Sequence, residues 1–377
     1  MSPSTITPKL FQPIQVGNIT LSHRLVLAPL TRYKATKTAH VPVVSLVKEY
    51  YSQRSSTPGT LLVTEATFIA AKAGGYANVP GIWSPEQITA WKEVTDQVHA
   101  NGSFIFLQLW ALGRAAYPDV LASEDLSLSF VAPSSIPLSS HPTAVPRELT
   151  TTEIHEYVQL YAQAAKNAVL EAGFDGVEVH GANGYLVDQF LQDVSNRRSD
   201  EYGGSVEARS RFGLEVIDAI VDAVGPERTA IRLSPWSLFQ DMGMQDPVPQ
   251  FTHFVSTLKA KHPTLAYIHV VEPRINGNAD RTTIGAHESN DFIRTIWSPL
   301  PFITAGGYTR DTAIEAVEKN GGLVAFGRWF LSNPDLPLRL KKNIPLSPYD
   351  RKTFYVPVDK ENPEVGYIDY PFAEATA

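Results

Sequence analysis

The sequence predicts a (β/α)₈ barrel, with a cap formed by the N-terminal segment and an excursion after the third strand. Helical patterns separate most of eight short apolar runs, which lie at 25–28, 61–65, 104–109, 176–180, 229–233, 267–271, 301–304 and 323–326. Such runs, rich in β-branched residues, are typical of strands buried on both faces. Because alternating strands and helices predict parallel strands, eight units predict closure into a barrel.

The helical segments expected between the strands are 86–100, 152–171, 205–224, 250–261 and 309–320. Pro85 suits the first turn of the first helix. We expect Thr152 to cap the second helix, which should end before Gly173. An open doubly wound sheet is the alternative fold, but it usually carries a Gly-rich phosphate turn after its first strand, and no such turn follows residues 25–28.

The remaining segments are expected to complete one barrel domain that spans residues 1–377. Residues 111–150 are rich in Pro and Ser without a helical period, which predicts a lid-like excursion over one mouth of the barrel. The segment through Thr20 should cap the other end. The tail after Pro345 is rich in Tyr, Phe and Pro, so we expect it to pack on the barrel.

Composition excludes several classes of function. The net charge of -7 gives no electrostatic basis for binding nucleic acid. The absence of Cys excludes disulfides, thiolate metal sites and thiol nucleophiles, and no metal-binding His motif is present. No apolar stretch reaches the ~18 residues that span a membrane. We therefore expect a cytoplasmic protein, a monomer or homodimer, without a bound metal.

Polar residues and glycine turns follow the predicted strands, where barrels of this class keep their chemistry. Glycine turns after the seventh and eighth strands predict a phosphate site, because bare backbone N–H groups can approach oxygens closely. These turns are Gly306-Gly307 and Gly327, the latter followed by Arg328, which adds a charged donor. The alternative is that the glycines only make tight turns.

A guanidinium and an imidazole also lie at strand ends. Arg232, within the fifth strand, favours a cofactor that carries or develops negative charge, although an internal pair with Glu65 or Glu178 is the alternative. His180, a core histidine in the alternative reading, is followed by Asn183 and Tyr185. Two donors beside a phenol suit a substrate carbonyl that becomes enolate-like.

Further candidates for ligand contact are Thr31, Gln108, Trp110 and Tyr355. The first two are polar groups near the ends of the first and third strands. Trp110 and Tyr355 are aromatic, and at a barrel mouth such residues serve packing as often as binding.

Several motifs resemble the Old Yellow Enzyme family, in the branch shared by yeast, fungal and plant members, over nearly the whole chain. They include Leu27-Ala28-Pro29-Leu30-Thr31-Arg32, Leu107-Gln108-Leu109-Trp110, Val177-Glu178-Val179-His180, Asn183-Gly184-Tyr185-Leu186, Asn196-Arg197-Arg198-Ser199-Asp200 and Ser332-Asn333-Pro334-Asp335-Leu336.

The resemblance implies a non-covalent FMN across the barrel mouth and NADPH as hydride donor. By the family pattern, Thr31 bonds the flavin O4, Gln108 the pyrimidine edge, and Arg232 the N1/O2 side. His180 and Asn183 would hold the activating oxygen of the substrate, and Tyr185 would be the proton donor. The remaining site residues implied are Pro29, Leu30, Ala66, Gly306, Gly307, Gly327 and Arg328 for the cofactor, and Trp110 and Tyr355 for the substrate.

The activity implied is that of an ene-reductase, in which hydride passes from FMN to the β carbon of an α,β-unsaturated carbonyl or nitroalkene. Two alternatives stay open: an FMN barrel that carries out a specialised biosynthetic reduction or an isomerisation, and a non-catalytic flavin-binding protein. Ala66 and Gly307 depart from the family pattern, and residues 111–150 match no pattern closely. These departures concern substrate preference.

Overall fold

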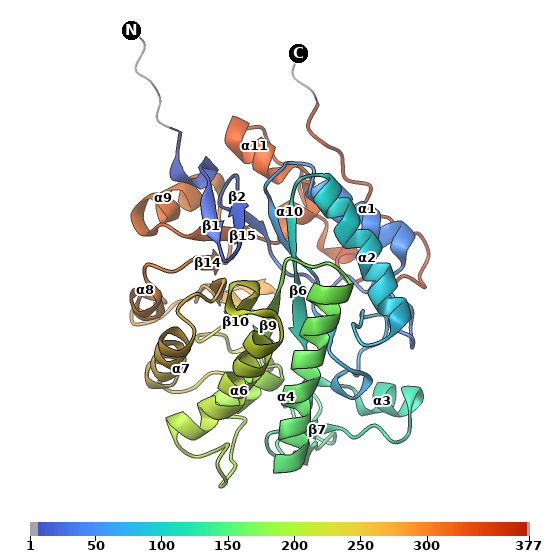
Figure 1. Cartoon of the computed structure of the whole chain (residues 1–377), viewed down its shortest axis with the longest axis vertical. Coiled ribbons are helices and arrows are strands. Elements are labelled where there is room, and N and C mark those ends of the chain that lie inside the picture. Colours follow the sequence, from blue (N-terminus) through green and yellow to red (C-terminus); the bar gives the residue numbers. More distant parts are fainter. Residues whose placement is uncertain (1–6, 375–377) are drawn as a thin grey trace.

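Eight parallel strands close into a barrel at the centre of the molecule (Figure 1), in a computed structural model that describes residues 7–374. Neighbouring strands pair in chain order, and β15 pairs with β3 to complete the ring. The short β5 (Thr67–Phe68) pairs with the end of β6. The barrel strands are β3 (Leu25–Leu27), β4 (Leu61–Val63), β6 (Phe104–Trp110), β9 (Gly176–Gly181), β10 (Thr229–Leu233), β11 (Tyr267–Val271), β14 (Phe302–Ala305) and β15 (Leu323–Phe326). The predicted fold class is confirmed, and the open-sheet alternative is wrong.

Helices surround the barrel and connect successive strands. The long connecting helices are α1 (Val44–Arg54), α2 (Pro85–Ala100), α4 (Thr151–Lys166), α6 (Val206–Val224), α7 (Val248–Lys261) and α9 (Arg310–Asn320). Shorter helices are α3 (Pro118–Glu124), α5 (Leu186–Leu191), α8 (Asp291–Trp297), α10 (Arg328–Ser332) and α11 (Leu336–Lys342). Across residues 7–374, no helix combines the length and apolar character needed to cross a membrane.

The N-terminal cap of α4 differs from the prediction. Thr150, not Thr152, accepts the backbone N–H of Glu153, and the Glu153 carboxylate accepts the Thr150 N–H in return. This reciprocal capping box needs an acidic or amide residue three positions after the cap, which Thr150 has and Thr152 lacks. The helix then continues through one π-helical turn, Asn167–Glu171, to the predicted end.

Two connecting helices were not predicted from the sequence. The residue before α1 is Val43, which has no side-chain acceptor for the free N–H groups of the first turn. Helix α8 begins after Asn290, a favoured cap residue, and Ser289 Oγ accepts the N–H of Asp291 (3.1 Å), but the helix has only seven residues. Helix α1 therefore lacks a local start signal, while α8 is too short to show a clear helical period, and packing against the barrel stabilises both.

The N-terminal segment closes the end of the barrel at which the strands begin, as predicted. Strands β1 (Ile14–Val16) and β2 (Ile19–Leu21) form an antiparallel hairpin. The side chains of Val16 and Leu21 are fully buried in one apolar cluster with Phe106 and Tyr267, which belong to barrel strands. The hairpin therefore covers the amino ends of the strands and leaves the opposite mouth for chemistry.

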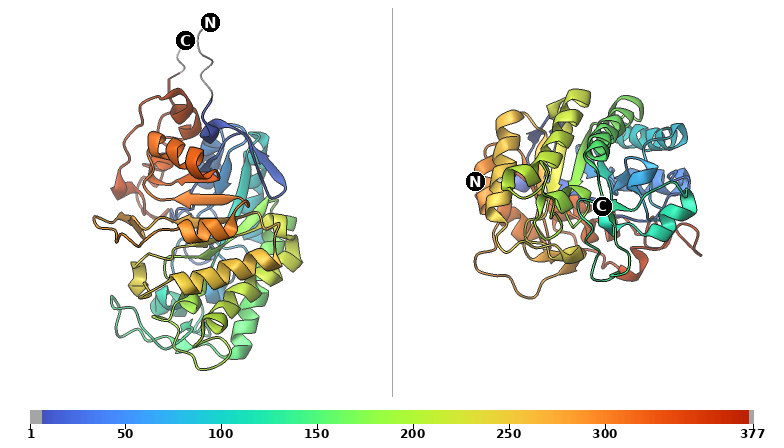
Figure 2. Two further views of the ribbon diagram at one scale, coloured as in Figure 1. Left: turned by 90° about the vertical axis from the view of Figure 1, so that its left-hand side faces the viewer. Right: turned by 90° about the horizontal axis from the view of Figure 1, so that it is seen from below.

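The excursion after β6 lies at that opposite mouth. Although its sequence shows no helical period, the excursion contains the helix α3 and a short parallel pair of strands, β7 (Val131–Ala132) with β8 (Arg147–Glu148). The buried Arg198 anchors it by donating to the carbonyls of Pro133 (2.9 Å) and Leu149 (2.6 Å). Figure 2 (left) shows the excursion and the gold loop between β11 and β14 projecting on one side of the molecule.

The C-terminal tail packs back on the barrel, as predicted. Tyr367 is fully buried and stacks on Tyr50 of α1, with 4.4 Å between ring centroids. Arg32 donates to the Gly366 carbonyl (2.8 Å) and Arg54 to the Tyr367 carbonyl (3.2 Å). Two buried guanidinium groups thus hold the tail beside the first strand-to-helix loop. One further 3₁₀ turn of the tail, Arg351–Thr353, leads into the wall of the mouth.

Candidate active site

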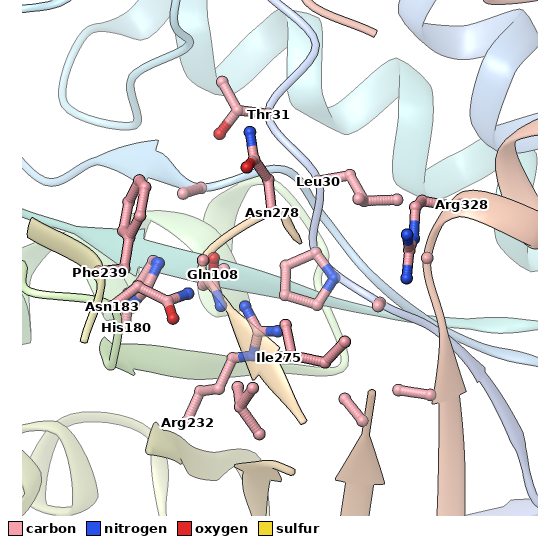
Figure 3. Close-up of a pocket in the computed structure, with 18 of the residues that line it drawn as sticks. Leu30, Thr31, Gln108, His180, Asn183, Arg232, Phe239, Ile275, Asn278 and Arg328 are labelled. Carbon is pink, nitrogen blue, oxygen red and sulfur yellow. The ribbon is translucent and has the colours of Figure 1, made fainter. Parts of the chain in front are cut away.

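A cavity of about 520 Å³ opens at the carboxyl ends of the barrel strands. This volume is in the range of small-molecule and cofactor sites. Figure 3 shows Arg328 at one end of the cavity, His180 and Asn183 at the other, and Arg232 between them. Every site residue predicted from the sequence lines the cavity: Pro29, Leu30, Thr31, Ala66, Gln108, Trp110, His180, Asn183, Tyr185, Arg232, Gly306, Gly307, Gly327, Arg328 and Tyr355.

A buried network lies beneath the middle of the cavity. Glu178 is fully buried and accepts hydrogen bonds from Gln108 Nε2 (2.7 Å) and His269 Nδ1 (2.9 Å). Burial alone raises the pKa of Glu178, but His269, Arg232 and Gln108 together bring that pKa below its usual range. Burial also lowers the pKa of His269. Glu178 is therefore the fixed negative charge of this network, and His269 is a neutral donor to it.

Arg232 faces the cavity without a carboxylate bonded to it. Within residues 7–374, no ion pair involves Arg232, and its buried Nε has no hydrogen-bond partner. Burial lowers the pKa of this guanidinium, which Glu178 partly offsets. Its strand register places it opposite His180 and His269. A buried donor that the protein leaves unpaired is costly, so this position fits a ligand with an acceptor edge.

His180 and Asn183 present donors at the end of the cavity away from Arg328. The His180 Nδ1 accepts the backbone N–H of Ala182 (3.4 Å), which leaves the proton on Nε2. Burial, then Arg232, lowers the pKa of His180 well below its usual value, so the ring is neutral. Asn183 has a left-handed backbone (φ 57°), and Ser234 Oγ accepts its N–H at 2.7 Å. These bonds fix the His180 ring and the backbone of Asn183 at the rim.

Tyr185 lies beside both donors. Its ring centroid is 4.8 Å from that of His180 and 4.7 Å from that of Trp110, edge-on to each. Trp110 in turn stacks on His180 at 6.0 Å. Burial raises the pKa of the Tyr185 phenol, so it keeps its proton at neutral pH. The three rings form one packed unit at the substrate end.

The predicted phosphate end contains the two glycine turns and a bound carboxylate. Gly306 and Gly307 have positive φ angles (144° and 63°), a conformation that suits glycine. Arg328 donates to both carboxylate oxygens of Asp280 (2.8 and 2.6 Å). A β carbon at Gly307 would lie 3.7 Å from Asp280 Oδ1. Arg328 is thus paired with an exposed carboxylate beside the glycine turn, in the bidentate manner in which it would pair with a phosphate.

Other residues of the cavity wall were not predicted from the sequence. Seven of them are aromatic and lie outside the barrel strands: Tyr33, Tyr76, Tyr117, Phe239, Tyr308, Trp329 and Phe354. The ionisable partner of Glu178, His269, was also missed, although a polar residue between the apolar Ile268 and Val270 is a usable signal. Tyr355 lies at the rim, 45% exposed and edge-on to Tyr33.

These features define a parallel barrel with a site for a cofactor that has an electron-rich edge and an anionic tail. The unpaired Arg232 and the Gln108 amide fit the edge, while Arg328 and the glycine turns fit the tail. A flavin nucleotide has both parts. The residues present therefore fit a flavin, and the class of protein is a flavin-dependent barrel oxidoreductase.

The chain belongs to the NADH:flavin oxidoreductase / NADH oxidase family, whose model matches residues 9–347. It is 52% identical, over 97% of its length and 96% of the relative's, to a chanoclavine-I aldehyde reductase of Penicillium roqueforti. It is 50% identical, over 98% and 96% of the two chains, to a probable inactive reductase of Epichloe festucae var. lolii. The crystal structure of Old Yellow Enzyme from Pichia sp. superposes with a TM-score of 0.88 at 39% identity, covering 97% of this chain and 94% of that chain. The resemblance to Old Yellow Enzyme is confirmed.

Proposed function

We propose that the protein is an ene-reductase that binds FMN non-covalently and uses NADPH to reduce α,β-unsaturated carbonyl compounds or nitroalkenes. When bound, FMN supplies the hydride chemistry by accepting hydride from NADPH and passing it to the β carbon of the alkene. The absence of Cys supports a cofactor that no thioether tethers. A cytoplasmic location and a monomeric or homodimeric state remain predictions.

The observation that carries the proposal is the grouping of two neutral donors with one neutral phenol. The Nε2–H of His180 and the amide of Asn183 line the same end of the cavity and would bind the activating oxygen of the substrate. Charge develops on that oxygen when hydride adds to the β carbon, so donors fixed in advance stabilise the transition state. Tyr185, 4.8 Å from His180 between ring centroids, would deliver its proton to the α carbon.

Arg232 and Glu178 would set the electrostatics beneath the cofactor. Arg232 is the cation that lines the middle of the cavity, and Glu178 lies fully buried behind it. A fixed positive charge at the pyrimidine edge favours the electron-rich form of a flavin, while the buried carboxylate offsets part of that charge. Gln108, held by Glu178 at 2.7 Å, would be oriented toward the same edge.

A conjugated aldehyde is the substrate class that we favour, because the relative from P. roqueforti is by name an aldehyde reductase. A specialised isomerisation on the same barrel is the second candidate, and the placement of Tyr185 favours net reduction over it. The relative from Epichloe is by name probably inactive, so a non-catalytic role is the third candidate. The unpaired Arg232 Nε and Trp110 Nε1 argue against a non-catalytic role, because buried donors without a hydrogen-bond partner lower stability and would bring no benefit.

Turnover of NADPH with and without trans-2-butenal, under anaerobic conditions, separates the candidates. We expect NADPH oxidation that depends on the enal and yields butanal, and FMN in the supernatant of heat-treated protein. Rearranged substrate without net NADPH consumption would indicate an isomerase. Release of FAD from the protein, or bound FMN that reacts with neither NADPH nor the enal, would overturn the proposal.

A further inference from the structure

A second cavity, of about 360 Å³, adjoins the first and is here called the annex. Three aromatic residues, Tyr76, Tyr117 and Phe239, line both cavities. The rest of the annex comes from two parts of the excursion, at residues 114–118 and between 138 and 144, and from the turn at 239–241. The annex therefore lies between the lid-like excursion and the loop that follows β10.

The annex joins the substrate end of the main cavity rather than the phosphate end. Figure 3 shows Phe239 near His180 and Asn183, on the side opposite Arg328. A chain of rings links the two cavities, because Trp110, which stacks on His180, lies 5.7 Å edge-on from Tyr76. Tyr76 lies 5.2 Å from Tyr117. A substrate bound at His180 can therefore extend along aromatic surface into the annex.

Polar bonds tie the two sides of the annex wall together. Arg114, 3% exposed, donates to the carbonyls of Gln240 (2.9 Å) and Asp241 (3.3 Å). The Asp241 carboxylate accepts from Ser139 N (2.5 Å) and Ser139 Oγ (2.6 Å), which ties the excursion to this turn. Gln240 and Asp241 both have left-handed backbones (φ 59° and 57°). Adjacent non-glycine residues in that region are strained, and such strain is often kept at ligand sites.

The annex presents aromatic surface beside two opposite charges. Tyr117 is 46% exposed, although it is a large aromatic side chain facing two cavities. Arg114 and Asp241, which both line the annex, carry opposite charges. These features suit an uncharged aromatic group better than a cation or an anion.

We propose that the annex binds the distal aromatic ring system of the substrate, so that the preferred substrates are conjugated aldehydes or ketones extended by an aryl group. The proposal rests on the proposed function, because it places the activated alkene at His180 and Asn183. The aromatic wall of Tyr76, Tyr117 and Phe239 would stack on the distal ring.

A matched pair of variants tests the annex. Ala144 lines the annex, so Ala144→Trp should fill it. Val145, the next residue, does not line either cavity and is 56% exposed, which makes Val145→Trp the control. The probes are trans-2-butenal, which is too short to reach the annex, and 3-(4'-hydroxybiphenyl-4-yl)propenal. Each is assayed for KM and kcat, and the corresponding saturated aldehydes are titrated against the flavin absorbance for Kd.

We expect Ala144→Trp to raise KM and Kd for the biphenyl compounds about ten-fold or more, with both butenal constants within about two-fold of wild type. Val145→Trp should change neither KM nor Kd for the two kinds of probe. Equal effects of Ala144→Trp on both probes, or no effect on the biphenyl compounds, would overturn the annex proposal. If wild type fails to reduce butenal, the proposed function is wrong, while the Kd of the saturated biphenyl aldehyde in the two variants still decides whether the annex binds.

Discussion

Tyr185→Phe should separate the two half-reactions of the proposed enzyme. The substitution removes one hydroxyl and keeps the ring, whose packing against Trp110 (4.7 Å) and His180 (4.8 Å) should be preserved. Flavin reduction by NADPH needs no proton from this residue, so its rate should stay within about two-fold of wild type. Alkene reduction loses a positioned acid and should slow by roughly 10²–10⁴-fold, or about 3–5 kcal/mol in activation free energy. The buried phenol keeps its proton because burial raises its pKa, so the loss should be present across neutral pH.

Anaerobic stopped-flow absorbance measures the two steps separately, the first as flavin bleaching by NADPH and the second as recovery of colour with 2-cyclohexenone. Tyr33→Phe is the control, since Tyr33 lines the same cavity without a proposed role in proton transfer. Nitroalkenes form a stable anion after hydride addition, so their reoxidation step should slow much less. Equal slowing of both half-reactions would point to a structural role for Tyr185. Unchanged enone reduction would mean that the proton comes from elsewhere.

Three further predictions follow from the same site and from the barrel beneath it. Para-substituted phenols should bind the oxidised protein with a long-wavelength charge-transfer band, and replacing His180 and Asn183 with Ala should abolish it; tight phenol binding by the double variant would contradict the anion-site assignment. Asp280→Ala should free Arg328 and tighten FMN binding by up to about five-fold, measured by flavin fluorescence quenching in the apoprotein, and unchanged affinity would show that the pair does not compete. Burial lowers the pKa of His23 to about 4 from 6.5, so the unfolded imidazole takes up its proton first as the pH falls. The contribution of His23 to the free energy of unfolding should then drop by about 3 kcal/mol between pH 6.5 and 4, measured as the difference between wild type and His23→Gln, and an identical pH dependence of the two proteins would contradict it.

The barrel could be predicted from the sequence because its strands are encoded locally. Each barrel strand is short, apolar and buried on both faces, and the predicted bounds differ from those observed by two residues at most, as at Leu61–Val63. Helix starts were predictable where a side chain signals them, as Ser84 does for α2 through its capping box with Gln87. Helix α1 carries no such signal, and α8 is only seven residues long, so contacts distant in sequence hold both in place.

Some residues of the candidate site could also be predicted from the sequence, and others could not. Residues on strand ends, such as Gln108, His180 and Arg232, could be brought together from the sequence because parallel strands present their carboxyl ends at one mouth. Tyr76, Tyr117 and Phe239 could not, because each lies on a loop whose course depends on tertiary bonds such as those of Arg114 and Asp241. The pairing of Arg328 with Asp280 joins residues 48 positions apart and has no local signature either.

The charged groups beneath the site lie on barrel strands, while loops supply most of the aromatic residues around the substrate end. Beneath the cavity, Glu178 and Arg232 supply one fixed charge of each sign, and burial keeps His180 neutral. In the proposed reaction, the donor end would bind a neutral carbonyl without the desolvation cost of an imidazolium, yet a cation would remain close to the position where negative charge develops. Glu178, His180 and Arg232 all lie on barrel strands, so their placement does not require the excursion or the 239–241 turn. Substrate preference is then free to change through aromatic loop residues that do not alter the charge of the reacting centre.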